Sequence, residues 1–193
     1  MNPLLRYRIA VVDGDRDFVS LVSGELERRL QRSDWFVPAY TSADQLLQDV
    51  EKTDPLVVPV CLVADTAARS PSVENGVFAL TKKLVPRCRT VYYSSTMDKQ
   101  KELEHSLLVD RSIWRGERDA IAVLANVLRH EIAEFERSVE FKLLTAFSAS
   151  VAADPEPEMS SGSEGGKNLS PMKMLIEMAR RTEDGLMYLH RLC

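Results

Sequence analysis

The stretch Ile9-Ala10-Val11-Val12-Asp13-Gly14-Asp15-Arg16-Asp17-Phe18 decides the fold. Its four leading apolar residues predict a buried strand, and that strand opens directly into a group of acidic residues. Carboxylates gathered at the end of a buried strand are suited to holding Mg²⁺ or a phosphoryl group, because oxygen is the ligand that Mg²⁺ prefers. The chain therefore has either a working acidic site here or what remains of one.

The residues that follow alternate between short apolar runs and amphipathic segments. This alternation predicts a three-layer, doubly wound α/β fold in which a five-stranded parallel sheet is covered by helices on both faces. Strands are expected at 8–12, 35–40, 57–64, 90–93 and 112–114, and helices at 17–30, 43–50, 76–84 and 97–107.

Composition limits the classes of function. The chain has 193 residues, of which 45% are hydrophobic and 28% charged, as in an ordinary water-soluble domain. Its net charge of −4 gives no basic footprint for nucleic acid and no polybasic patch for membranes. The first residues have no signal-peptide core, and the three cysteines have no CxxC spacing. We expect a cytoplasmic protein that binds neither nucleic acid nor membrane.

A long helix is predicted to begin at Glu117 and to continue as a helical extension over 129–150. Its apolar positions step by three and four, as in a coiled coil. This apolar face could pack on the chain's own domain or on a second copy of the chain. A helix of some 30 residues is ~45 Å long, more than a domain of this size can cover, which favours a homodimer. The seam consists of Ala125, Leu128, Ile132, Phe135, Val139, Lys142 and Ala146, and the predicted interface residues are Leu128, Ile132, Phe135 and Val139.

Residues 151–169 are acidic and rich in Pro, Ser and Gly, which predicts a flexible linker. Ser170-Pro171 then forms a helix start, and 170–193 is predicted to be a tethered amphipathic docking helix. The alternative is that this helix folds back onto the chain's own domain. Its predicted contact residues are Leu175, Met178, Leu186 and Leu189.

Over roughly residues 6–128 the pattern resembles the receiver domain of bacterial two-component response regulators, so the domain is assigned to 1–128 with a receiver/flavodoxin-like fold. The resemblance implies that Asp13 belongs to the acidic pair after the first strand and that Asp65, after Cys61-Leu62-Val63-Ala64, matches the phosphoacceptor. It also implies that Ser94, after Val91-Tyr92-Tyr93, matches the switch hydroxyl. Arg115, after Ser112-Ile113-Trp114, stands where the family has a lysine, and Ala39-Tyr40-Thr41-Ser42-Ala43-Asp44-Gln45-Leu46 resembles the family's second strand and helix.

Several positions depart from the family pattern. Gly14 offers no ligand where the family has a second carboxylate. Asp15 lies one residue further along, where its side chain need not point into the site. The loop 66–76 is long and lacks the family's Met-Pro pair, and Ser112 stands at the aromatic switch position. These changes favour a phosphorylation-independent pseudo-receiver that works through a protein partner and is not an enzyme. No cofactor is expected, and Asp13 and Asp65 would bind Mg²⁺ weakly or not at all.

Three other interpretations are open. The chain could be a phosphorylatable stand-alone response regulator that uses Asp65. Asp13-Gly14-Asp15 also resembles the opening motif of haloacid-dehalogenase phosphatases, although the helix that follows leaves no room for that family's flap. The acids could simply cap the following helices. A DNA-binding regulator is excluded because no helix-turn-helix pattern follows residue 128.

Overall fold

The computed structural model describes residues 4–52, 54–65, 76–95, 107–153 and 170–191. Most of the helix expected at 97–107 lies outside these residues. The strands are β1 (Arg6–Val12), β2 (Trp35–Phe36), β3 (Ala39–Tyr40), β4 (Val57–Ala64), β5 (Arg89–Ser94) and β6 (Arg111–Trp114). The helices are α1 (Arg16–Leu30), α2 (Ala43–Lys52), α3 (Gly76–Leu84), α5 (Ala120–Arg137), α6 (Val139–Ala153), α7 (Pro171–Arg180) and α8 (Glu183–Arg191).

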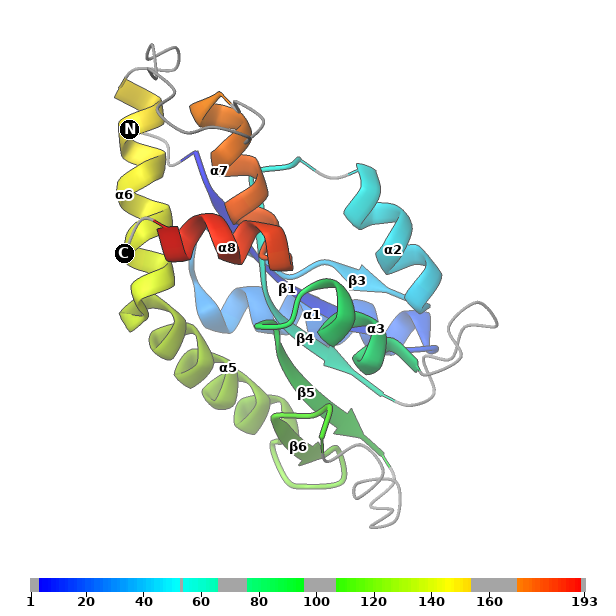
Figure 1. Cartoon of the computed structure of the whole chain (residues 1–193). Helices are drawn as coiled ribbons and strands as arrows, with labels where there is room; N and C mark the ends of the chain where they lie inside the picture. Colours follow the sequence, from blue (N-terminus) through cyan, green and yellow to red (C-terminus); the bar gives the residue numbers. More distant parts are fainter. Residues whose placement is uncertain (1–3, 53, 66–75, 96–106, 154–169, 192–193) are drawn as a thin grey trace.

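The strands form one parallel sheet in the order β2-β1-β4-β5-β6, with β3 also paired to β1. Helices α1 and α5 pack on one face and α2 and α3 on the other (Figure 1). Side chains alternate along β1, so that Ile9 and Val11 enter the α1–α5 core while Ala10 and Val12 enter the α2–α3 core. The predicted three-layer α/β fold is confirmed.

The second strand is interrupted, and this is where the sheet differs from the predicted five strands. β2 pairs with the start of β1 and β3 with its end, so the two pieces lie in line. Between them the side chain of Glu27 accepts the Val37 N–H at 3.2 Å, and Pro38 has no N–H to donate. Neither residue donates to β1, although the Pro38 carbonyl accepts the N–H of Val11 at 3.0 Å where the pairing resumes.

The long helix expected from Glu117 is instead two helices, α5 and α6, separated at Ser138. The backbone of Ser138 is extended, with φ −64° and ψ 153°. Its hydroxyl donates to the carbonyl of Phe135 at 2.6 Å and accepts the N–H of Phe141 at 3.1 Å. One serine therefore ends α5 and caps the start of α6, which redirects the chain.

The C-terminal segment forms a hairpin of two helices rather than the single helix predicted. The expected start is confirmed, because the Ser170 hydroxyl accepts the N–H of Lys173 at 3.4 Å and Pro171 is the first helical residue. Arg181 then takes the left-handed conformation at φ 56° and ends α7. A Cβ atom at Gly185 would collide with the carbonyl oxygen of Glu177, so glycine lets α8 approach α7 closely.

This hairpin packs on the rest of the chain at the amino ends of the strands. Leu175 and Met178 are fully buried and Leu189 is 4% exposed, in the same core as the first residues of β1 and β4. α7 contacts α6 and β4, and α8 contacts α6 (Figure 1). Docking onto the chain's own domain, the alternative to a free docking helix, is the arrangement that the structure has.

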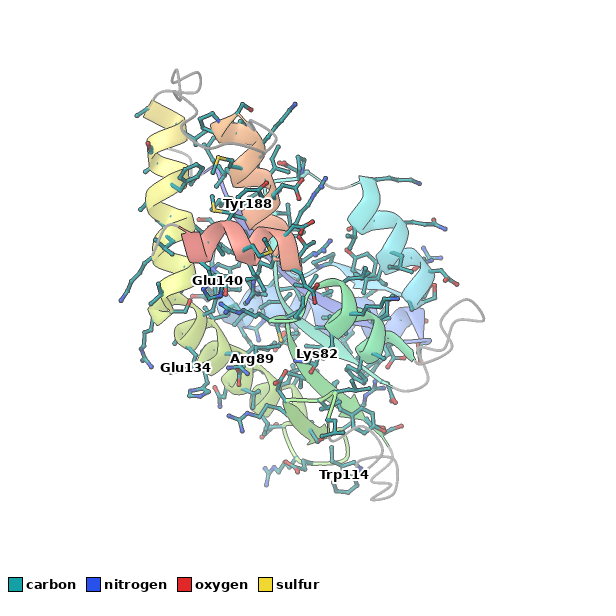
Figure 2. All side chains as sticks on the ribbon, viewed as in Figure 1. Lys82, Arg89, Trp114, Glu134, Glu140 and Tyr188 are labelled. Carbon is teal, nitrogen blue, oxygen red and sulfur yellow. The ribbon has the colours of Figure 1, made fainter. Side chains whose placement is uncertain are left out.

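A buried ion pair joins the hairpin to α6. The Arg181 side chain donates from Nε to Oε1 of Glu140 at 2.5 Å and from Nη2 to Oε2 at 3.2 Å. It also donates to the carbonyl oxygens of Pro59, at 2.7 Å, and of Arg87, at 3.0 Å. Arg181 is 3% and Glu140 7% exposed, and Glu140 lies between α6 and the C-terminal helices (Figure 2). These contacts fix the turn between α7 and α8 against β4.

The two described cysteines, Cys61 and Cys88, are buried in the core. Burial raises the pKa of the Cys88 thiol to about 11 and that of Cys61 well above its usual value. Because the thiolate is the reactive form, neither should react with a thiol reagent in the folded protein. In a Cys193→Ser background, Ellman's reagent at pH 8 should detect two thiols in denaturant and almost none without it. Rapid reaction in the folded state would show that one of these sites opens to solvent.

Candidate functional site

Three charged side chains meet at the carboxyl edge of the sheet. Asp13 directly follows β1, Asp65 follows β4 and Arg115 follows β6. Parallel strands end at a common edge, so residues distant in the sequence come together there. Asp13 is 4% and Asp65 6% exposed, and the side chain of Arg115 is 16% exposed. The structure therefore brings together the acid, the phosphoacceptor-like acid and the cation that the sequence predicted.

The guanidinium of Arg115 bridges the two carboxylates. Its Nη2 donates to Oδ2 of Asp13 in a short hydrogen bond and lies 3.3 Å from Oδ2 of Asp65. Its Nε donates to the carbonyl oxygen of Tyr93 at 2.9 Å. The planar fork of arginine makes this three-way contact possible, whereas a lysine ammonium is a point charge on a flexible stem.

Two aromatic rings hold the guanidinium in place. Its central carbon lies 4.1 Å from the ring centroid of Phe18 and 5.1 Å from that of Tyr93. The two rings are stacked, with centroids 6.2 Å apart. Burial raises the pKa of the Tyr93 hydroxyl, and the positive charge of Arg115 opposes this rise. Cation–π contacts of this kind add to the ionic ones, so the cation is fixed on several sides.

Asp15 does not belong to the pocket. It is exposed, and its side chain accepts the N–H groups of Asp17 at 3.0 Å and Phe18 at 3.1 Å, which makes it the N-cap of α1. The helix-capping interpretation is thus confirmed for this residue. Asp13 is oriented differently, because its Oδ1 accepts the N–H of Asp15 at 2.8 Å while Oδ2 meets Arg115.

The receiver fold implies a Mg²⁺ ion at this edge, and the residues here do not fit one. Mg²⁺ requires several oxygen ligands in octahedral arrangement. Gly14 supplies none and the Asp15 carboxylate is used as a helix cap. The two remaining acids share a guanidinium, whose charge replaces that of a cation. Among the described residues no group of three or more His, Cys, Asp or Glu side chains is arranged to hold a metal ion.

The two switch-like serines lie in different surroundings. Ser94 is 3% exposed at the end of β5, and its carbonyl oxygen accepts the N–H of Arg115 at 2.8 Å. Ser112 is exposed on β6, in register with Tyr92. Only Ser94 is therefore placed beside the acidic site.

The predicted dimer seam is corrected by the structure. Leu128, Ile132 and Phe135 are 0%, 5% and 7% exposed because they fill the chain's own core against α1 and the sheet. Val139 is 61% exposed, since the break at Ser138 rotates α6 away from the direction of α5. The four residues therefore do not form the continuous apolar surface on which the homodimer prediction was based.

The predicted contact residues of the C-terminal segment are corrected in the same way. Leu175, Met178 and Leu189 are buried within the chain and Leu186 is half-buried, so they are not anchors waiting for another protein. No helix in the described part of the chain is long and apolar enough to span a bilayer.

Sequence reasoning missed two groups of residues. Phe18 and Tyr93 both contact the Arg115 guanidinium, which the strand and helix pattern does not indicate. Arg181 is among the most deeply buried charges, and the helical pattern of residues 170–193 does not single it out. Its signal was weak, because its partner Glu140 is 41 residues away and nothing in the sequence links them.

Comparison with known proteins supports the fold. No protein-family model matches the sequence, and no curated protein matches it. The structure is similar to a signal receiver domain of an HD domain-containing protein from Pseudomonas fluorescens Pf-5, with a TM-score of 0.50 and 15% identity over 66% of this chain and 98% of that chain. It is similar to the BeF3-activated DrrB receiver domain, with a TM-score of 0.50 and 16% identity over 67% and 99% of the two chains.

A third similar structure is described as an adenylate cyclase from Rhodopirellula baltica. Its TM-score is 0.51, with 18% identity over 78% of this chain and 99% of that chain. At these identities the likeness concerns the arrangement of strands and helices and not the chemistry of the site. This chain has the fold of a response-regulator receiver domain.

Proposed function

We propose that this protein is a phosphorylation-independent receiver-like module that acts through protein–protein contacts in signal transduction in a bacterial cytoplasm. The observation that carries the proposal is the position of Arg115, whose guanidinium pairs with both Asp13 and Asp65. In a switch operated by phosphorylation, the acceptor carboxylate has to be open to a phosphoryl donor and a metal ion. Here an internal cation is bonded to that carboxylate.

The energetic argument concerns the exchange that phosphorylation would need. The Arg115 side chain would have to leave two buried carboxylates, the carbonyl oxygen of Tyr93 and two aromatic rings. Leaving a buried charge without its partner costs about 3–5 kcal/mol. A Mg²⁺ ion with two protein carboxylates would not offset this cost easily, because it dehydrates reluctantly. The pocket is therefore suited to one fixed state.

The proposal predicts that the wild-type protein takes up little phosphoryl group. Incubation with acetyl phosphate and Mg²⁺ should leave almost all of the protein at its unmodified mass. The double variant Gly14→Asp with Arg115→Lys restores a carboxylate and removes the planar bridge, so it should bind Mg²⁺ more tightly and gain label. Gly14 does not have a positive φ angle, so its backbone accepts aspartate. Intact-mass spectrometry and Mg²⁺ titration measure the two effects.

The control is Asp65→Asn in the double variant, which should abolish any label gained. Substantial labelling of the wild type that disappears in Asp65→Asn would show instead that the protein is a phosphorylatable response regulator. A phosphatase role receives no support from the site, because the second acid of that motif, Asp15, is engaged in capping α1.

A further inference from the structure

A cavity of about 400 Å³ lies on the α2–α3 side of the sheet, far from the acidic site in the fold because it sits at the amino ends of the strands. It is open to solvent and bordered by the ends of α2 and α3, by β4 and by the junction of α7 and α8; Figure 1 shows how these elements are arranged. Most of its wall is apolar, formed by Val50, Pro55, Val57, Pro59, Leu84 and Val85.

The buried charged group in the lining of this cavity is Arg8, a residue in the middle of a buried strand. Its side chain is 6% exposed. It donates from Nη1 to Oδ2 of Asp49 at 3.3 Å, and it also interacts with the Tyr40 hydroxyl. A guanidinium carries five N–H donors. Asp49 is itself 43% exposed and also accepts the Tyr40 hydroxyl at 2.5 Å, so it neutralises Arg8 only in part. A buried cation with donors to spare needs a further acceptor.

A second cation stands at the rim. Arg180, at the end of α7, is 54% exposed, and its described partner is Glu177 one turn earlier at 3.1 Å. The acid in the lining, Asp54, has an oxygen that accepts the N–H of Leu56 at 2.9 Å. The lining itself carries two arginines and one aspartate, and the partners of the arginines, Asp49 and Glu177, are not part of it.

A second cavity among the described residues shows the contrast. It has a similar volume, about 400 Å³, and is lined by both acids and bases. There Asp110 pairs with Lys82 at 2.8 Å, and Arg89 reaches Glu131 at 3.3 Å. Its charges already satisfy one another, so it has no comparable demand for an anion.

We propose that the Arg8 cavity binds a carboxylate with an apolar body. A guanidinium recognises a carboxylate through two parallel hydrogen bonds, and the aliphatic and proline walls would cover the rest of the molecule. A volume of this size is typical of pockets for small ligands, in which apolar walls surround a few polar groups. Two sources share this chemistry: a free branched-chain organic acid and the C-terminal carboxylate of a peptide that ends in an aliphatic residue.

Such a ligand would join the hairpin to the sheet. Arg8 belongs to β1, whereas Arg180 and Thr182 belong to the α7–α8 hairpin. A carboxylate held between them would add contacts that exist only when the hairpin is docked. This inference goes beyond the proposed function and does not depend on it, because it concerns another edge of the sheet and another ligand.

Isothermal titration calorimetry of the full chain tests the proposal. One probe is 4-methylpentanoate, with the neutral 4-methylpentanamide as its matched control. The other is an acetylated tripeptide that ends in leucine with a free carboxylate, with its C-terminal amide as the control. At least one carboxylate should bind about tenfold or more tightly than its amide, since charge-assisted hydrogen bonds are lost in the amide. The tighter of the two carboxylates identifies the source.

Three variants assign the binding to this cavity. Arg8→Gln should weaken carboxylate binding by about tenfold or more. Arg180→Gln should weaken it by a smaller factor, and this variant serves even if Arg8→Gln fails to fold. Arg28→Gln is the matched control, because Arg28 also makes an i,i+3 pair on an exposed helix surface but lies on α1, on the other face of the sheet.

Equal binding of acid and amide would overturn the proposal, and so would binding that Arg8→Gln and Arg180→Gln leave unchanged. Inorganic phosphate is a further probe, and affinity equal to that of the carboxylates would show that the apolar walls play no part. The acetyl phosphate experiment gives an independent result, so failure of one proposal leaves the other intact.

Discussion

Replacing Arg181 by methionine is expected to lower the free energy of unfolding by about 3–5 kcal/mol. The physical reason is the state of Glu140, which is 7% exposed and would be left as a buried carboxylate without its bidentate partner. The carbonyl oxygens of Pro59 and Arg87 would lose donors as well. Urea unfolding followed by circular dichroism measures the change.

Two controls separate the ion pair from a general effect of the substitution. Arg180→Met alters the neighbouring residue, whose side chain is 54% exposed, and should cost no more than about 1 kcal/mol. Arg181→Met with Glu140→Leu replaces the pair by apolar groups and should recover much of the loss, since buried ion pairs are often replaceable in this way. If Arg181→Met alone unfolds at the wild-type urea concentration, the hairpin is not held as described.

The second large effect is expected from Leu175→Ala with Met178→Ala. Both side chains are fully buried between α7, α6 and β4. Truncation of one such side chain costs about 2–5 kcal/mol, so the pair should cost about 4 kcal/mol or more, with some coupling because they lie on one helical face. The melting temperature of the whole domain should fall by several degrees, as measured by differential scanning calorimetry.

Met187→Ala is the matched control for this prediction. Met187 lies on α8 of the same hairpin but is 53% exposed, so its truncation should change the melting temperature little. An unchanged melting temperature in Leu175→Ala with Met178→Ala would restore the view of residues 170–193 as a free docking helix. The structure leads us to expect the opposite.

The sheet could be predicted because its signals are local. The last four residues of β1 and the whole of β4 are apolar, and an aspartate follows each strand directly, which locates both the strands and their carboxyl edge. The two helix breaks could not be predicted in the same way. Ser138 lies within a three-four apolar pattern that continues on both sides of it, and its role as a double cap depends on where the chain must turn to cover the core. Arg181 ends a helix in the left-handed conformation, which favours glycine or asparagine, because its side chain is held by distant groups.

For the acidic site, the sequence predicts which residues meet but not how their side chains are arranged. Asp13, Asp65 and Arg115 each follow a strand, so topology brings them together. The bridging geometry, and the clamp formed by Phe18 and Tyr93, depend on side-chain directions that a linear pattern does not encode. Arg8 is noticeable in the sequence, since an arginine inside an otherwise buried strand requires a partner. The sequence does not show that this partner, Asp49, neutralises its charge only in part.

The docking of α7 on β4 has a consequence for how the protein is made. Leu175 and Met178 complete a core that includes residues of β1 and β4, such as Ile9 and Val58, so these contacts span more than one hundred residues of sequence. Contacts of such long range form late and slow the folding of a domain. During synthesis the amino edge of the sheet, including Leu5 and Val58, remains uncovered until the last helices emerge. Nascent chains that lack residues 170–193 should consequently expose apolar surface to which chaperones bind. The last two helices then cover that surface and complete the folded domain.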